Sequence, residues 1–426
     1  MAIDFPNSPA TNDTYTVGSR TWTWTGSIWE LKANSVGAGS VGTTELADNA
    51  VTTAKITAGA VVEADIASNA VTAGKLGADV QLGYRNVVIN GAMQVHQRGT
   101  STAGITTGGY YTADRYNLYI NSLGTWTQSV ESDAPTGSGF RKSLKMLCTT
   151  ADASPSANDY IMVEQSIEGQ NVQQFLKGTS SAKPFALSFW VKSNVTGTYI
   201  AELFDSDTAG ARLVSASYTI SASATWEKKT IIFPADTTGL FDNDTAASLT
   251  VEFWLGSGSA YASGTLNNAW AAANSSNRAV GQTNLASATS NYWQVTGVQL
   301  EVGAVATPFE FEDIGVTLQK CQRYYQRRSG EKNYGLLTAQ TGSNLYGVIP
   351  LPVSMRVAPT SIDAGSLRAF DLFNAAQVFY TFGLDGTVST ENTVGIAATA
   401  TGFTAFRTYY IIHNGGSSYL GFSAEL

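Results

Sequence analysis

This chain of 426 residues contains few of the histidines and cysteines that Ser-His-Asp and Cys-His hydrolases use. There are only two histidines, His96 and His413, and they fall in different predicted domains, whereas a Ser-His-Asp or Cys-His arrangement needs a histidine beside its nucleophile. Both are interpreted as structural or surface groups. Cys321 lies on the apolar face of a predicted helix, which favours a small core residue over a nucleophile. No GxSxG, HExxH or P-loop pattern occurs, so no catalytic residue is predicted.

Two pairs of carboxylates have spacing that could support sugar chemistry. Asp205 and Asp207 stand in LFDSD, and Asp242 and Asp244 stand in FDNDT. Alternate residues of a strand share a face, and glycoside hydrolysis needs two carboxylates a few ångströms apart. Because Gly and Thr surround both pairs, we interpret them as Asx-type turns. A catalytic pair and a structural calcium ion are the alternatives; no other cofactor or metal is predicted.

The charge balance excludes some partners. The formal net charge is −8 and the isoelectric point is near 4.9, whereas nucleic acids and anionic membranes attract basic surfaces. No apolar run approaches the roughly 20 residues of a membrane span. The N-terminus lacks the positive charge and apolar run of a signal peptide. We therefore expect a chain that is made in a cytoplasm, without nucleic-acid binding or membrane insertion.

The elements that must position these residues are mainly strands. Only 14% of residues are charged and 41 are glycine, which is typical of a β-rich protein with a neutral polar surface. Alternation of apolar residues, as in PFALSFWVKSN, predicts half-buried strands. The predicted order is an N-terminal β module (1–32), a repeat stalk (33–82), a jelly-roll β-sandwich (83–312), a connecting helix (313–330) and a C-terminal β tip domain (331–426).

The connecting helix is predicted from DIGVTLQKCQRYYQRR. Ile314, Leu318, Cys321 and Tyr325 recur at helical spacing and would form one apolar face. Asp313 is positioned to cap the N-terminus, and arginines fall in the last turn, where they complement the helix dipole.

The first 32 residues contain Trp22, Trp24 and Trp29 among short alternating segments. Three tryptophans are a large apolar content for so small a unit, and a unit of this size is marginally stable alone. We therefore expect this module to associate with another surface.

Residues 41–80 repeat every ten residues, with Val first and Leu or Ile sixth in each block. One copy buries too little apolar area to offset the ordering entropy of its ten residues, about 1–2 kcal/mol each. Several copies that meet along an axis could bury these side chains against one another, and we interpret the repeat in this way. A solvated linker is the alternative. The predicted axis positions are Val41, Leu46, Val51, Ile56, Val61, Ile66, Val71 and Leu76.

Sugar binding needs exposed aromatic rings beside amides and hydroxyls. Tyr261 and Trp270 stand in a long polar segment, 256–284, where they either contact a ligand or pack back onto the sandwich. Tyr346, Tyr380 and Tyr419 are candidates in the C-terminal domain, although about half of the aromatic residues there must be core. These five residues are the predicted glycan-binding set.

The repeat, with AVTTAKI, resembles the stalk repeats of homotrimeric bacteriophage tail fibres. RNVVINGAMQVHQRGT (85–100), YYTADRYNLY (110–119) and NYWQVTGVQLEVGAVATPFEFED (291–313) resemble the limits of the jelly-roll, carbohydrate-binding-like domain of such fibres. PLPVSMRVAPT (350–360) and SSYLGFSAEL (417–426) resemble a distal domain.

The resemblance implies a virion protein, and the lack of a catalytic pattern in the sequence favours one without enzymatic activity. Its tryptophan-rich end would bind a tail, adaptor or baseplate protein, its stalk would be a homotrimer, and its distal β domains would bind a host surface polysaccharide or lipopolysaccharide. A fibre with polysaccharide hydrolase or lyase activity, and a structural tail or baseplate protein, are the alternatives.

The repeat makes a prediction about mass in solution. We expect the full chain to be a trimer by mass photometry, and a variant that lacks residues 34–80 to lose most of this association. A full chain that is monomeric, yet folded through the repeat, would contradict the interpretation of the repeat.

Overall fold

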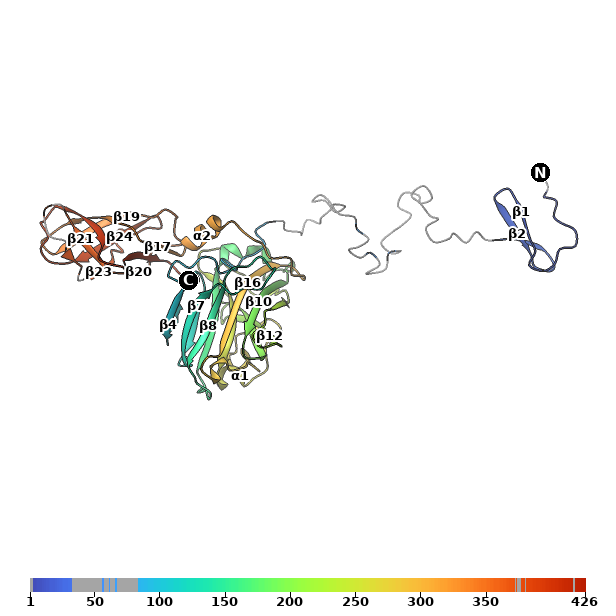
Figure 1. The fold of residues 1–426 in the computed structure, drawn as a ribbon, viewed down its shortest axis with the longest axis horizontal. Helices are drawn as coiled ribbons and strands as arrows, with labels where there is room; N and C mark the ends of the chain where they lie inside the picture. The colour runs from blue at the N-terminus through green and yellow to red at the C-terminus, as the bar shows by residue number, and fades with distance from the viewer. Residues whose placement is uncertain are drawn as a thin grey trace. The chain divides into compact units, whose positions relative to one another are not determined.

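The computed structural model describes residues 3–32, 56, 61, 66, 83–371, 373, 377–379, 381–416 and 418–426. The chain divides into two compact units, Met1–Val80 and Gln81–Leu426, and each is considered by itself. Both are built mainly from strands, as predicted (Figure 1). In these described ranges no helix has both the length and the apolar character needed to cross a membrane.

The N-terminal unit contains a three-stranded antiparallel sheet of β1 (Thr14–Val17), β2 (Arg20–Trp24) and β3 (Trp29–Leu31). Trp24 and Trp29 pair directly across β2 and β3, and the ring of Phe5 stacks on Trp29 at a centroid distance of 5.2 Å. All three tryptophans are half-buried in this cluster. Their attachment role stays a prediction.

Three of the eight predicted axis residues belong to the described part of the chain. Ile56, Val61 and Ile66 are 43%, 51% and 44% exposed in one copy. The remaining five lie outside the described residues: Val41, Leu46, Val51, Val71 and Leu76. Association through the repeat therefore stays a prediction.

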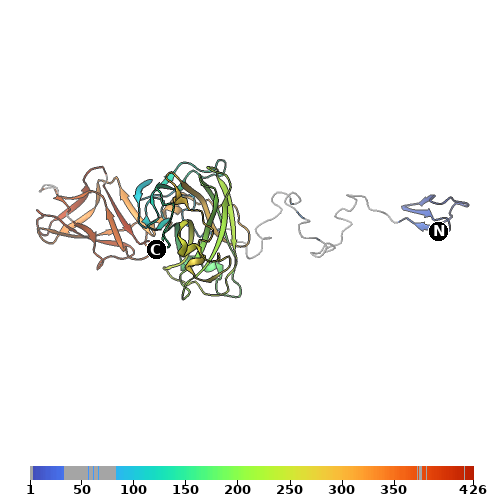
Figure 2. The same cartoon turned by 90° about the horizontal axis from the view of Figure 1, so that it is seen from below.

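The second unit begins with a β-sandwich of two antiparallel sheets (Figure 2). One sheet has the order β13-β10-β16-β8-β7-β4, and the other β15-β12-β11-β14-β9-β6-β5. The strands are β4 (Ser101–Ile105), β5 (Gly109–Tyr110), β6 (Asn117–Asn121), β7 (Thr125–Glu131), β8 (Ser143–Thr150), β9 (Tyr160–Glu168), β10 (Phe185–Ser193), β11 (Gly197–Asp205), β12 (Arg212–Ile220), β13 (Glu227–Phe233), β14 (Ala247–Ser257), β15 (Ala271–Ala272) and β16 (Tyr292–Val302). The short helix α1 is Ser259–Ala262, and 3-10 turns span Gly169–Asn171, Gln173–Phe175, Ser275–Asn277 and Leu285–Ser287.

Alternation along the strands makes the core of the sandwich. Phe185, Leu187, Phe189 and Val191 of β10 are all fully buried in one continuous apolar cluster between the sheets. Such alternation places every second side chain on the same face of a strand. The segment from which the sequence predicted a half-buried strand therefore supplies a central part of the core.

The connecting helix is shorter than predicted. Helix α2 is Ile314–Gln322, and the carboxylate of Asp313 accepts the Gly315 amide at 2.8 Å, as expected of a cap. Residues 325–329, predicted as helix, instead form β17. The backbone of Tyr325 pairs with Ser423, and this pairing with a distant strand replaces further helical turns. The predicted apolar face is also incomplete, since Cys321 is buried but Ile314 is 49% exposed.

The distal domain therefore begins at β17 and contains two sheets. The smaller has the order β17-β26-β20 and the larger β22-β21-β25-β18-β19-β24-β23. Their strands are β17 (Tyr325–Ser329), β18 (Asn333–Ala339), β19 (Asn344–Pro350), β20 (Ser361–Ala364), β21 (Leu367–Phe370), β22 (Gln377–Val378), β23 (Thr381–Leu384), β24 (Thr393–Thr399), β25 (Thr408–His413) and β26 (Tyr419–Ser423). Their facing side chains form a second apolar core.

The sandwich and the distal domain are joined by buried ionic contacts. Glu425 of the distal domain forms ion pairs with Arg115 and, at 3.2 Å, with Arg98 of the sandwich. The side chains of Arg115 and Glu425 are only 1% and 7% exposed. Arg115 also donates to the Ser166 carbonyl at 2.6 Å and lies over the ring of Tyr324 at 3.5 Å.

A second ionic contact lies beside the first. Arg323 donates two hydrogen bonds of 2.7 Å to the carboxylate of Glu168, which also accepts the Tyr324 hydroxyl at 2.5 Å. Burial opposes ionisation of Glu168, but these hydrogen bonds outweigh it and hold its pKa below the ordinary value. These ionic contacts hold the distal domain and the end of the connecting helix against the sandwich.

The junction predicts a large effect for one substitution. Glu425→Ala leaves the buried Arg115 without its carboxylate, which typically costs about 3–5 kcal/mol. The matched control is Glu312→Ala, because the Glu312–Lys320 pair is 31% exposed on each side and such pairs contribute about 1 kcal/mol or less. Urea unfolding of both variants measures the difference. Equal losses would contradict the central role of Glu425.

Candidate functional site

The carboxylates singled out in the sequence make turns. Asp205 is fully buried and accepts the amides of Asp207 and Thr208 and the Thr208 hydroxyl, which is an Asx-type arrangement. Its other partner is Lys177, whose ammonium lies 2.5 Å away. These contacts occupy both oxygens of Asp205 and agree with the interpretation as a turn.

In the second pair, Asp244 makes the same kind of turn, whereas Asp242 contributes its backbone amide. The Asp242 amide donates to Asp207 at 2.8 Å, and Asp244 accepts the Ala246 amide at 2.9 Å. Across the described ranges, no three His, Cys, Asp or Glu side chains are grouped to hold a metal ion. Burial raises the pKa of the Cys321 thiol well above its ordinary value, which disfavours the thiolate needed of a nucleophile.

The four predicted glycan-binding residues that the structure describes do not form one site. Trp270 packs on the sandwich core and donates from its indole to the Pro234 carbonyl at 2.9 Å, so it follows the packing alternative. Tyr261 packs against Tyr160 and Trp254. Tyr346 is 40% exposed on β19, and Tyr380 lies outside the described residues. Tyr419 lines an open groove, described below.

A row of carboxylates that the sequence did not reveal crosses the outer face of the seven-stranded sandwich sheet. Glu164, Glu252 and Glu202 lie directly opposite one another on β9, β14 and β11, with Asn117 of β6 opposite Glu164. Like charges in such positions repel. Arg278 compensates two of them, through ion pairs of 2.6 Å to Glu202 and 2.5 Å to Glu252.

Burial of this row affects both its ionisation and its access. Glu202 and Glu252 are 0% and 4% exposed, so a substrate does not reach them, and the ion pairs fix the segment that carries Arg278 onto the sheet. Burial, with the charge of Glu252, raises the pKa of Glu164 to about 7. Glu164 is half-buried, whereas Glu202 and Glu252 are buried and committed to Arg278.

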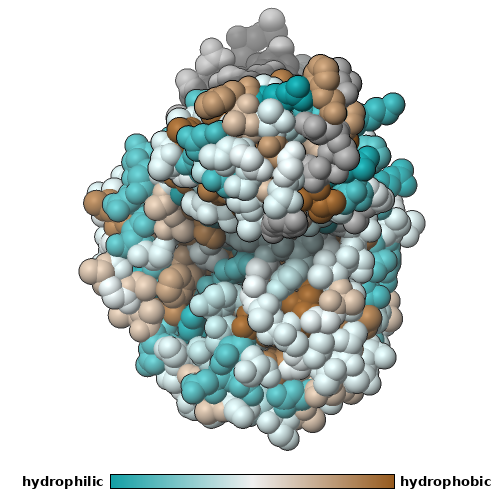
Figure 3. Space-filling view, turned by 90° about the vertical axis from the view of Figure 1, so that its left-hand side faces the viewer, coloured by the Kyte–Doolittle hydropathy of each residue, from teal (hydrophilic) through white to brown (hydrophobic). Residues whose placement is uncertain are grey.

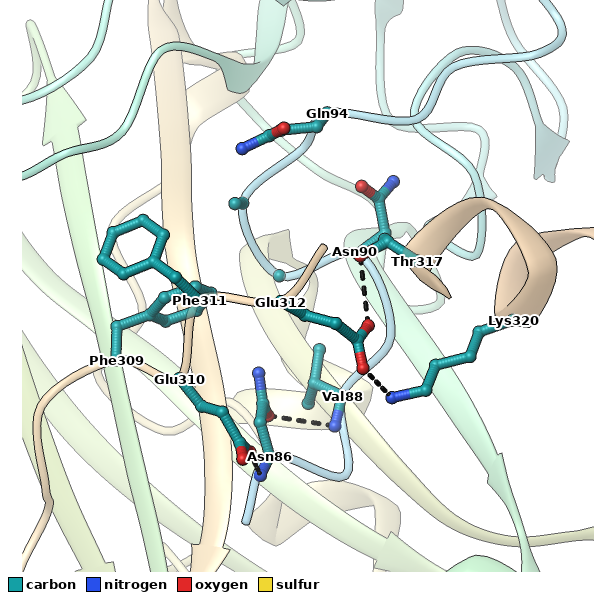
Figure 4. Close-up of a pocket in the computed structure, with 12 residues that line it drawn as sticks. Asn86, Val88, Asn90, Gln94, Phe309, Glu310, Phe311, Glu312, Thr317 and Lys320 are labelled. Carbon is teal, nitrogen blue, oxygen red and sulfur yellow. Dashed lines mark hydrogen bonds and ion pairs between the residues drawn. The ribbon is translucent and has the colours of Figure 1, made fainter. Parts of the chain in front are cut away.

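Two further hollows lie in the second unit. The one in Figure 4 lies between Phe309, Phe311, Gln94 and the start of α2, and has a volume of about 50 Å³, enough for one or two water molecules. In it Glu312 accepts Thr317 and Lys320. The other, of about 320 Å³, contains Lys320 and Arg323, and both cations are already paired with glutamates.

The largest of the three hollows is the junction groove, an open cavity of about 420 Å³ between the sandwich and the distal domain. Seen from the distal side, the surface is recessed where the two domains meet (Figure 3). The sandwich supplies one wall and β17, β20 and β26 supply the other. The residues that line it are Arg98, Thr102, Tyr110, Tyr111, Tyr325, Arg327, Ser361, Asp363, Tyr419 and Ser423.

The groove combines tyrosine rings with fixed polar groups. Tyr111 and Tyr419 are half-exposed, and the guanidinium of Arg327 lies 3.6 Å from the Tyr419 ring centre. The Tyr325 hydroxyl donates to Asp363 at 3.0 Å. Burial raises the pKa of Tyr110 and of Tyr325 above that of an ordinary phenol, which is already protonated at neutral pH.

The predicted set contained only Tyr419 of these residues. Tyr110, Tyr111 and Arg98 stand in the segments YYTADRYNLY and HQRGT, but they meet Tyr419 and Arg327 only when the domains dock, more than two hundred residues apart in sequence. In the sequence, the only indication of this site was that two adjacent tyrosines follow an arginine by about a dozen residues.

The carboxylate row predicts a dependence of stability on pH. Because the folded pKa of Glu164 exceeds its ordinary value of 4.5, the folded state binds this proton more tightly, and stability falls as pH rises from about 4.5 to about 7. We expect Glu164→Gln to remove about 1–3 kcal/mol of this fall between pH 5 and pH 8. Urea unfolding at both pH values measures it, with the exposed Glu331→Gln as control. An unchanged fall in Glu164→Gln would contradict the raised pKa.

Known proteins offer only distant similarity. No family model matches the chain, and no curated protein matches it. The solved structures that are similar to about half of it include the following three. The enzymatically active domain of bacteriophage CBA120 tailspike protein 4 is 15% identical over 51% of this chain and 22% of its own, with a TM-score of 0.28. A putative sugar binding protein of Bacteroides thetaiotaomicron is 10% identical over 51% of this chain and all of its own, with a TM-score of 0.28.

The third is a family 11 carbohydrate-binding module of Clostridium thermocellum, 13% identical over 48% of this chain and 98% of its own, with a TM-score of 0.26. The function is therefore inferred from the geometry of the junction groove.

Proposed function

We propose that this chain is a bacteriophage tail fibre that binds a host surface glycan in the junction groove, without cleaving it. The observation that carries the proposal is the composition of the groove: half-exposed tyrosine rings beside guanidinium, carboxylate and hydroxyl groups in an open cavity of about 420 Å³. Sugar rings offer C–H faces to aromatic rings and hydroxyls to polar side chains, so such a lining suits a glycan.

The rest of the chain supports the same assignment through its sequence. The repeat at 41–80 resembles a homotrimeric fibre stalk, and the tryptophan-rich module would attach the fibre to a tail or baseplate protein of the virion. Trimerisation would present three grooves to one cell surface, and linked sites raise the apparent affinity well above that of one site.

Tyrosine substitutions test the groove. We expect Tyr111→Ala and Tyr419→Ala each to weaken binding of the full chain to bacterial surface polysaccharides at least about tenfold, equivalent to roughly 1.4 kcal/mol. Tyr410→Ala is the matched control, because Tyr410 is 41% exposed on β25 and does not line the groove. Titration on a polysaccharide array measures the affinities.

Release of reducing ends during incubation would instead indicate a cleaving fibre. Binding that survives both groove substitutions but is lost in Tyr346→Ala would move the site to the exposed face of β19. A full chain that binds no bacterial polysaccharide or cell would overturn the proposal.

A further inference from the structure

The arginines of the junction groove point to the chemical class of its ligand. Among its lining residues, Arg98 and Arg327 are cations and Asp363 is the one carboxylate. This local balance is opposite to that of the whole chain, whose formal net charge is −8. An arginine that is partly withdrawn from water is stabilised by a nearby anion.

Arg327 lacks an anionic partner. In the part of the chain that the structure describes, no carboxylate lies within ion-pair distance of it. One terminal nitrogen donates to the Arg98 carbonyl at 2.8 Å, and Nε is buried without an acceptor. The guanidinium carbon of Arg327 lies 3.6 Å from the Tyr419 ring centre, which is a cation–π contact.

Arg98 is only partly compensated. One terminal nitrogen lies 3.2 Å from Glu425, but that carboxylate is shared with the buried Arg115. The other terminal nitrogen is buried without an acceptor, and the guanidinium lies 3.5 Å from the Tyr325 ring centre. Both groove guanidinium groups thus lie against tyrosine rings, and among the described residues Arg327 has no carboxylate partner.

Asp363 sets where an anion could lie. Its carboxylate accepts the Tyr325 hydroxyl through both oxygens, at 3.1 and 3.0 Å, and it is exposed on β20. It would repel a negative group nearby and accept a sugar hydroxyl instead. The lining therefore has a cationic part for an anionic substituent and an anionic part for hydroxyls.

We infer that the glycan bound in the junction groove is acidic, with a carboxylate or phosphate substituent placed against Arg327 and Arg98. Arginine recognises both groups through paired, charge-assisted hydrogen bonds, which a neutral sugar hydroxyl does not match. This inference rests on the proposed function, because it specifies the class of glycan that the same groove binds.

The test compares chemically matched ligands. The full chain is titrated with a uronic acid-containing bacterial polysaccharide and with the same polysaccharide after carboxyl reduction, and with a phosphorylated polysaccharide before and after removal of phosphate. We expect neutralisation of the recognised group to weaken binding at least tenfold, and added salt to weaken only the binding of the acidic form. The pair of ligands that shows the loss of binding identifies the recognised group as a carboxylate or a phosphate.

Two substitutions in the groove test the same inference. Arg327→Gln should abolish the preference for the acidic form, whereas Asp363→Asn should keep or increase it. Arg328→Gln is the matched control, since Arg328 is the next residue of β17 and donates to the Tyr334 and Pro350 carbonyls outside the groove. If Arg327→Gln fails to fold, Asp363→Asn and the paired ligands still decide.

Equal affinity for acidic and neutralised forms would overturn this inference and leave glycan binding intact. Absence of binding to every form would overturn the proposed function itself. Retention of the acidic preference in Arg327→Gln, or its loss in Asp363→Asn, would contradict the assignment of the cationic part of the groove.

Discussion

The second unit depends on one buried carboxylate, that of Glu425, which lies between two arginines of another domain. Taking three charged groups out of water is costly unless each is paired and hydrogen-bonded. Arg115 meets this condition through Glu425, the Ser166 carbonyl and the Tyr324 ring. The position of the distal domain, and hence of one wall of the groove, follows from this geometry. The apolar cores alone would not fix it, because they lie within each domain.

Charge is used sparingly and locally. With 14% charged residues, the surface is mostly neutral, and the buried charges concentrate where chain segments must be held together. Lys177 with Asp205 fixes a turn, Arg278 with Glu202 and Glu252 fixes a long segment onto a sheet, and Arg323 with Glu168 joins domains. Arg327 departs from this pattern, because among the described residues no carboxylate pairs with it.

The sequence predicts what depends on local periodicity. Alternation in PFALSFWVKSN correctly predicted a core strand, and Asp313 correctly predicted the start of α2. The end of α2 was not predictable in this way, because Tyr325 pairs with a strand almost a hundred residues later. To predict that Glu164, Glu252 and Glu202 lie opposite one another, one must know the order of the strands. To predict the groove, one must know how the two domains dock. Of the four predicted glycan-binding residues that the structure describes, Tyr419 alone lines the groove.

The two walls of the groove belong to different domains, and this links occupancy to mechanics. A molecule that touches both walls favours the docked arrangement over any in which the domains separate, and by reciprocity the docked arrangement favours that molecule. Force that separates the domains therefore opposes occupancy, and occupancy resists such force. The Glu425 contact is one of the interactions that such a force must break.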